Sequence, residues 1–440
     1  MTDYRFWNGL DTIGGNIVEV RTEKARVVCD FGLSVMERNF EKPANMTETE
    51  YLILENQLPA IPGLYHTSSF QELDLPSVET DERETALFIS HLHLDHMGGL
   101  KYLPENTIVY LSRESYDLYR TLLEVGEESP VEVTLRPMEY DETVTVGDIR
   151  VTAKHTDHDA AGAVAFFIET EDLKLIHSGD VRLSGNYPER VEKWTKEAAE
   201  WGPDVLLLEG TSYSFDPEEK EEEDAGKAER PSSEKELLQA MTDLLQKEKK
   251  QVIFYNPYIR NVERMKDVAE TVEANGRKMV FEERYARVLN AVYPETKWRV
   301  LEETLQDEKA AFIKETVSLS EVKQKPSAYV LQNSWQNLSF VDSFDSGVYC
   351  HSNGEPLGDY DSRYAEMLNR LEEANFGFVE MGASGHAKCE ELLDIANAAG
   401  AAVTIPWHTF RPEVYYEALI AHGVPSLLPE KGRTYTRDDR

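Results

Sequence analysis

The 440-residue sequence has few cysteines, no long apolar run and a shortage of positive charge. Its three cysteines, Cys29, Cys350 and Cys389, are widely spaced and form no Cys-x-x-Cys pair. We therefore expect neither a disulfide framework nor a thiolate metal site, which fits a reducing compartment. No stretch approaches the roughly 18 apolar residues that span a bilayer, and the N-terminus does not have the pattern of a signal peptide. The sequence predicts a soluble cytoplasmic protein without a membrane partner.

Positive charge is scarce: 46 lysines and arginines face 82 aspartates and glutamates, which gives a formal net charge of −36 at pH 7. A polyanion such as RNA is repelled by this charge at long range, so any nucleic-acid site must be locally basic. Two interpretations stay open. Either most of the acid forms a solvated surface, or the substrate is not a long nucleic acid.

The remaining composition is that of a globular enzyme. Hydrophobic residues make up 41% of the chain and aromatic residues 10%. A chain of this length can form about two or three domains with substantial cores, which excludes a disordered protein.

Metal-ligating side chains crowd the segment 90–99, which reads SHLHLDHMGG. The candidate ligands are His91, His93, Asp95 and His96. The apolar run 85–90 reads as a buried strand, after which the chain must turn and direct several side chains into one pocket. The first two histidines can bracket one ion, while the aspartate and the last histidine can reach a second. The glycines at 98 and 99 let the backbone pass close by. The segment predicts a site for two metals.

Two positions downstream complete this metal site. His158 lies in a predicted loop followed by small residues, and Asp180 follows an apolar strand. His155 is the rival of His158, but it still belongs to the preceding strand. We therefore prefer His158 as the ligand.

The first half of the chain is rich in short strands. We expect a hairpin within 14–34, a helix near 47–56, and strands at 131–136, 142–153, 164–169 and 173–178. Strand-rich segments with His and Asp in their loops favour a sandwich of two sheets.

The second half alternates strands and helices. The segment 215–230 reads as an acidic loop, and Ser233 with Glu236 fits a capping box that starts a helix. We then expect strands at 251–255, 278–281, 328–332 and 347–350, with helices at 262–274 and 285–292. This alternation predicts a parallel sheet covered by helices. The last segment, from 377 onward, returns to strand-loop-helix units.

In combination, these residues resemble the metallo-β-lactamase superfamily. Asp30, the cluster at 91–96, His158 and Asp180 match its successive motifs in order. The segments 208–211, 383–387 and 405–408 resemble three further motifs of the β-CASP branch, the nucleic-acid-processing members that include ribonuclease J.

The resemblance covers nearly the whole chain and implies its domain organisation. The fold class is α/β: an αββα sandwich with an inserted α/β β-CASP domain containing a parallel sheet. The sandwich would comprise residues 1–214 and 376–440, and the inserted domain residues 215–375.

The resemblance also implies two divalent metal ions, with Zn²⁺ favoured and Mn²⁺ as the alternative. The first metal would bind His91, His93 and His158, and the second Asp95, His96 and His408, with Asp180 bridging them. Asp30 would not bind metal itself but would orient one of the metal ligands. The predicted catalytic residues are Asp95, His386 and Glu209. Of these, His386 would protonate or stabilise the leaving oxygen, and Glu209 would position a ligand histidine.

The implied activity is hydrolysis of RNA phosphodiester bonds by a hydroxide that two metals activate. His408 favours single-stranded RNA, because DNA-processing members of the branch typically have an apolar residue there. Predicted substrate-binding residues are Arg260, Asn261, Arg264 and Ser384. Exonuclease and endonuclease modes both stay open, and a homodimer is expected only by analogy.

Two other functions stay open. The acidity, and departures from ribonuclease J at Arg260 and Gly382, favour a hydrolase of a small ester, thioester or phosphodiester. A scaffold role within an RNA-processing complex is weakened, because every catalytic motif residue is present.

Overall fold

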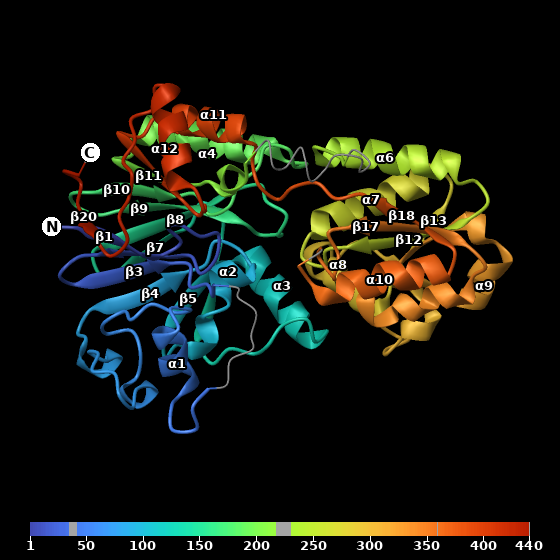
Figure 1. The fold of residues 1–440 in the computed structure, drawn as a ribbon, viewed down its shortest axis with the longest axis horizontal. Coiled ribbons are helices and arrows are strands. Elements are labelled where there is room, and N and C mark those ends of the chain that lie inside the picture. The colour runs from blue at the N-terminus through green and yellow to red at the C-terminus, as the bar shows by residue number, and fades with distance from the viewer. Residues whose placement is uncertain (35–41, 217–229, 359, 440) are drawn as a thin grey trace.

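A computed structural model describes residues 1–34, 42–216, 230–358 and 360–439. The chain forms two units that lie beside one another in Figure 1. Most of the predicted acidic loop, residues 217–229, lies outside the described residues. Among the residues that are described, no helix is both long and apolar enough to cross a membrane.

The first unit is built on two sheets that pack face to face. The first sheet has the order β20-β1-β2-β3-β4-β5-β6. Its strands are β1 (Asp3–Asn8), β2 (Ile17–Arg21), β3 (Ala25–Cys29), β4 (Glu84–Phe88), β5 (Ile108–Ser112), β6 (Thr134–Met138) and β20 (Thr434–Tyr435). The second sheet has the order β19-β11-β10-β9-β8-β7. Its strands are β7 (Thr143–Val146), β8 (Ile149–His155), β9 (Val164–Glu169), β10 (Lys174–His177), β11 (Val205–Glu209) and β19 (Val403–Trp407).

Apolar side chains explain this layering. Phe88 of the first sheet contacts Phe166 of the second within one buried cluster that fills the space between them. Helices α4 (Pro188–Trp201), α11 (Cys389–Ala399) and α12 (Pro412–Ala421) cover the outer face of the second sheet through a separate cluster. Helices α1 (Glu48–Leu54), α2 (Leu94–Met97) and α3 (Arg113–Glu124) pack against the first sheet through another cluster, and Figure 1 shows α2 and α3 on the side of the second unit. The predicted αββα sandwich is confirmed.

The second unit contains a five-stranded sheet of order β13-β16-β12-β17-β18 in which every neighbouring pair is parallel. Its strands are β12 (Val252–Pro257), β13 (Lys278–Val280), β16 (Tyr329–Gln332), β17 (Gly347–Ser352) and β18 (Phe376–Glu380). Its helices are α6 (Glu234–Lys247), α7 (Val262–Ala274), α8 (Glu283–Val292), α9 (Leu319–Gln324) and α10 (Ser362–Glu373). A two-stranded parallel pair, β14 (Trp298–Leu301) and β15 (Ile313–Val317), lies beside them. β18 extends the inserted sheet five residues past the predicted boundary at 375.

Several predicted elements match the structure closely. β9 and α7 have the predicted bounds, and the Ser233 side chain accepts a hydrogen bond from the Glu236 amide at the start of α6. The predicted strand at 142–153 is instead a hairpin of β7 and β8. Gly147, whose φ of +56° suits glycine, lies in its turn.

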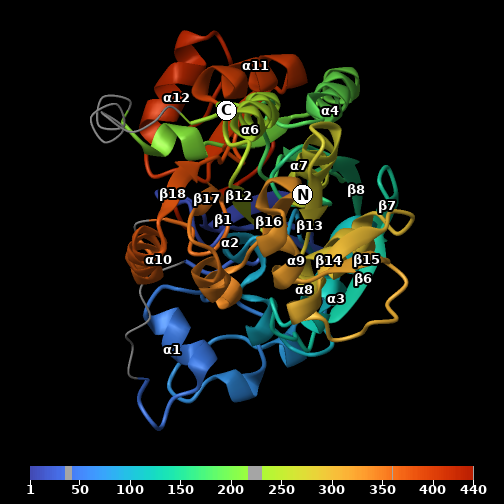
Figure 2. The ribbon, with the colours of Figure 1, turned by 90° about the vertical axis from the view of Figure 1, so that its right-hand side faces the viewer.

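Buried ion pairs join the two units. Arg182, which follows β10, and Arg264 of α7 both bond to Glu234 of α6, over 2.8 and 2.7 Å. All three side chains are buried, so loss of any one would leave an uncompensated charge. In addition, α3 and α8 lie side by side (Figures 1 and 2). These contacts fix the position of one unit relative to the other.

A second contact between the units predicts a pH effect on stability. Burial raises the pKa of Glu263 on α7 to about 7, although Arg190 of α4 pairs with it. The folded state therefore binds this proton more tightly than the unfolded state, whose value is near 4.5. The resulting stabilisation, up to about 3 kcal/mol, is complete below pH 4.5 and is lost as pH rises through 7.

The variant Glu263→Gln isolates this effect, because glutamine does not titrate. We expect its free energy of unfolding to fall less between pH 5 and pH 8 than that of the parent protein. Urea unfolding at both pH values measures the difference. Equal changes in the two proteins would contradict the prediction.

Candidate metal centre

The predicted ligands meet where loops leave one edge of the two sheets. His91 and His93 follow β4, and the short helix α2 carries Asp95 and His96. The other three come from distant positions after β8, β10 and β19: His158, Asp180 and His408. Tertiary folding thus gathers side chains separated by more than 300 residues into one cluster.

The ligand atoms form two groups. One contains His91, His93, His158 and Asp180, and the other contains Asp95, His96, Asp180 and His408. Within each group the ligand atoms lie within 4.8 Å of one another, and Asp180 belongs to both. These are the sets expected from the sequence, and their binding of metals stays a prediction.

Hydrogen bonds orient four of the imidazoles in the same way. Each uses Nδ1 for a protein contact, which leaves Nε2 for a metal. The contacts are His91 to Ser90 Oγ at 3.0 Å, His96 to Asp30 Oδ2 at 2.8 Å, His158 to the Gly385 carbonyl at 2.5 Å and His408 to Thr211 Oγ1 at 2.7 Å. The four Nε2 atoms lie 3.3 to 3.8 Å from an oxygen of Asp180.

Unpaired buried atoms at the centre fit divalent cations. Both oxygens of Asp180 and the Nε2 of His91 are buried without a hydrogen-bond partner. The Nε2 atoms of His96 and His408 lie 3.2 Å apart, an unfavourable contact for two lone pairs unless a positive charge lies nearby. Imidazole with carboxylate is a donor set that suits zinc and also accommodates manganese.

Burial favours the ligating form of His91 and His158. It lowers the pKa of His91 well below its usual value and that of His158 to about 3. Both side chains are therefore neutral at pH 7, as a metal ligand must be.

His386 lies beside both groups without belonging to either. Its Nδ1 is 3.1 Å from Glu209 Oε1 and 3.8 Å from Asp180 Oδ2. Burial alone would lower the pKa of His386, but the Glu209 carboxylate raises it to about 9. Glu209 thus contacts His386, whereas the sequence predicted a contact with a ligand histidine.

The contact predicted for Glu209 is made by Thr211, whose hydroxyl contacts His408 Nδ1 and whose amide donates to Glu209 Oε2. Thr211 is not among the residues predicted from the sequence. The signal was available, because this threonine lies two residues after Glu209 in a recognised motif.

The four predicted substrate-binding residues have different surroundings. Arg260 is buried and bonds to Glu128, Asn261 caps α7, and Arg264 is engaged by Glu234. Ser384 alone is exposed, two residues before His386. The first three therefore contact protein at the junction of the units, and their role in substrate binding stays a prediction.

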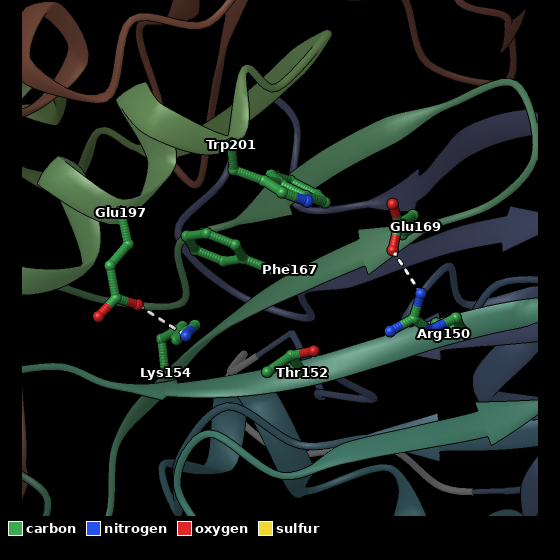
Figure 3. A pocket seen from close by; sticks show the side chains of 7 residues that line it. All are labelled: Arg150, Thr152, Lys154, Phe167, Glu169, Glu197 and Trp201. Atoms are coloured by element: carbon green, nitrogen blue, oxygen red, sulfur yellow. Dashed lines mark hydrogen bonds and ion pairs between the residues drawn. The ribbon is translucent and has the colours of Figure 1, made fainter.

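The hollow shown in Figure 3 is a different feature. It has a volume of about 240 Å³ and lies on the second sheet beside α4. Its charged groups pair with each other, Arg150 with Glu169 and Lys154 with Glu197. We find no orphaned charge there that would call for a ligand.

The two neighbouring histidines after β8 provide a matched test of the ligand assignment. His155 stacks on Tyr140 with ring centroids 3.9 Å apart and is outside both ligand groups. We expect His158→Gln to weaken binding of one metal per chain, whereas His155→Gln keeps both. Metal content after equilibrium dialysis measures this difference. Loss of metal from His155→Gln alone would reverse the assignment.

Comparisons with known proteins agree with this fold. The family model described as a β-lactamase superfamily domain matches residues 60–249. The chain is 27% identical over 176 residues to endoribonuclease YSH1 of Yarrowia lipolytica, covering 35% of this chain and 20% of that protein. The Saccharomyces cerevisiae protein of that name is 28% identical over 183 residues, covering 35% and 22%. The chain thus matches about a fifth of the length of these curated relatives.

A solved structure extends the similarity to the whole chain. It is a protein of unknown function from Enterococcus faecalis V583, with a TM-score of 0.84, 26% sequence identity and 99% of each chain covered. Residues 60–249 thus match a β-lactamase superfamily domain, and the similarity to the endoribonucleases supports a relation to the β-CASP branch.

Proposed function

We propose that the protein is a metal-dependent hydrolase that cleaves phosphodiester bonds of single-stranded RNA. The observation that carries this proposal is Asp180, shared by two ligand groups and flanked by His386. The relatives named endoribonucleases support RNA as the substrate, although the similarity covers only part of them.

The residues present fit two divalent metals, with zinc favoured by the histidines. The first would be held by His91, His93 and His158, the second by Asp95, His96 and His408, and both by Asp180. When bound, the ions supply Lewis acidity that neutralises phosphate charge and acidifies water. Asp30 and Thr211 hold their ligand histidines in place through Nδ1, so the donor atoms are oriented before substrate arrives.

His386 is placed to move a proton. Its Nδ1 bonds to Glu209, which fixes the ring and leaves Nε2 to donate to the departing oxygen. Glu209 is fully buried and accepts from the Thr211 amide, so its carboxylate has a defined position.

Exposure indicates the side from which the substrate approaches. The side chains of His93, Asp95 and His386 are 18%, 24% and 23% exposed, whereas His91, His96 and Asp180 are buried. The buried side excludes water, and the partly exposed side admits the phosphodiester.

A second candidate function is hydrolysis of a small ester, thioester or phosphodiester. The net charge of −36 opposes a long polyanion, and protein carboxylates already neutralise Arg260 and Arg264. A small substrate requires neither a basic channel nor free arginines.

RNA cleavage distinguishes the two candidates. A short single-stranded RNA, labelled at a 5′-monophosphate or 5′-hydroxyl end, is incubated with zinc- or manganese-loaded protein. We expect cleavage by the parent protein and none by the variant Asp95→Ala, His96→Ala. The product ladder separates attack from an end from internal attack. Absence of cleavage with two metals bound per chain would reject RNA in favour of a small substrate.

A further inference from the structure

His93 differs from the other ligand histidines in its second nitrogen. An oxygen of the protein contacts Nδ1 in each of the other four, which are His91, His96, His158 and His408. The Nδ1 of His93 instead lies 3.2 Å from the Nε2 of His158, inside the ligand group. Its Nε2 is buried and has no hydrogen-bond partner. This ring therefore lacks the outer contact that orients the other four.

Asp159 is the carboxylate that faces this unpaired nitrogen. Its Oδ1 lies 3.4 Å from His93 Nε2 and 3.3 Å from His158 Nε2. The residue is buried, and this oxygen also has no hydrogen-bond partner. Two complementary groups, one imidazole nitrogen and one carboxylate oxygen, are thus buried, adjacent and unsatisfied, an arrangement that native proteins seldom leave without a use.

The loop of His386 holds Asp159 against the metal group. The Gly385 carbonyl accepts from His158 Nδ1 at 2.5 Å. A Cβ added at Gly385 would lie 2.6 Å from Asp159 Cγ, so a larger residue would displace the carboxylate. The Asp159 carboxylate therefore packs closely against the loop of His386.

We propose that Asp159 is a positioning residue of the first metal: it accepts the Nε2 hydrogen of His93, which then presents Nδ1 to the ion. The separation of 3.4 Å exceeds an ordinary N–H···O bond by about 0.5 Å, a gap that a small rotation of either side chain closes. The carboxylate fixes the tautomer of His93 and raises its basicity as a ligand. This inference rests on the metal centre of the proposed function and is independent of RNA as the substrate.

The test measures metal affinity in the absence of RNA. Zinc is titrated against a competing chelator in the full-length parent protein, Asp159→Ala and Asp159→Asn. Alanine removes the acceptor, so we expect one of the two sites to weaken about 10- to 100-fold. Asparagine keeps an acceptor oxygen without the charge and should lose less. The visible spectrum of cobalt-loaded protein should change for alanine more than for asparagine.

Control measurements separate this role from others. Asp148→Asn makes the same change of charge at an exposed position and should bind metal like the parent. Unchanged affinity in Asp159→Ala would overturn the proposal, and so would equal losses for alanine and asparagine, which indicate a direct ligand or a charge effect. If affinity falls as expected while no variant cleaves RNA, the positioning role stands and the proposed substrate fails.

Discussion

Replacing Asp180 with asparagine is expected to reduce RNA cleavage about a thousand-fold or more and to weaken both metals. Asp180 is the only residue common to the two ligand groups found among the described residues. Stabilisation of charge by bound metals contributes several kcal/mol to such reactions, and each 1.36 kcal/mol changes the rate tenfold. Asparagine has nearly the same shape but no charge. The measurement is kcat/KM together with the metal content of the purified variant.

Neutralising a buried carboxylate also changes folding energetics, so a stability measurement accompanies the assay. Asparagine keeps the shape of this buried side chain, so we expect the variant to keep its fold by circular dichroism. Asp148→Asn serves again as the control for loss of one negative charge. A folded Asp180→Asn protein that retains two metals and full activity would refute the bridging role.

Most of the candidate metal centre was predictable from the sequence because its candidate ligands follow apolar strands. His91 to His96 form a contiguous motif after β4, and Asp180 follows β10. The choice of His158 over His155 was also accessible, since a residue inside a strand cannot turn into the loop cluster. The predicted pattern of alternating elements likewise produced the parallel sheet of the inserted unit.

Contacts between side chains that are far apart in the sequence were not predictable. The two arginines expected to hold RNA are paired instead with Glu128 and Glu234, more than 100 and about 30 residues away. A helix-start arginine looks the same in a sequence whether a phosphate or a carboxylate faces it. Asp159 was overlooked for a similar reason, because its role depends on His93 in another loop. The pair β14 and β15 was missed because both strands are short and their composition differs little from that of ordinary loops.

Replacing His386 with alanine is expected to reduce kcat about 100- to 10,000-fold while both metals stay bound, which is the range for loss of a general acid. The separation of these two effects follows from the geometry. His386 is outside both ligand groups, yet its ring centroid lies 5.2 Å from that of His158 and 5.9 Å from that of His408. It can therefore reach a phosphate at the metals without holding either ion.

The variant Glu209→Gln tests the same proton transfer with a smaller expected loss of activity. Glutamine keeps an oxygen that can contact His386 Nδ1 but removes the charge that favours the protonated ring, so we expect a smaller loss of kcat. An RNA with an activated leaving group, which needs no proton, should restore much of the lost rate in both variants. Acceleration by that leaving group in His386→Ala identifies the histidine as the acid. An equal deficit on both substrates would show that His386 acts by binding the phosphate instead.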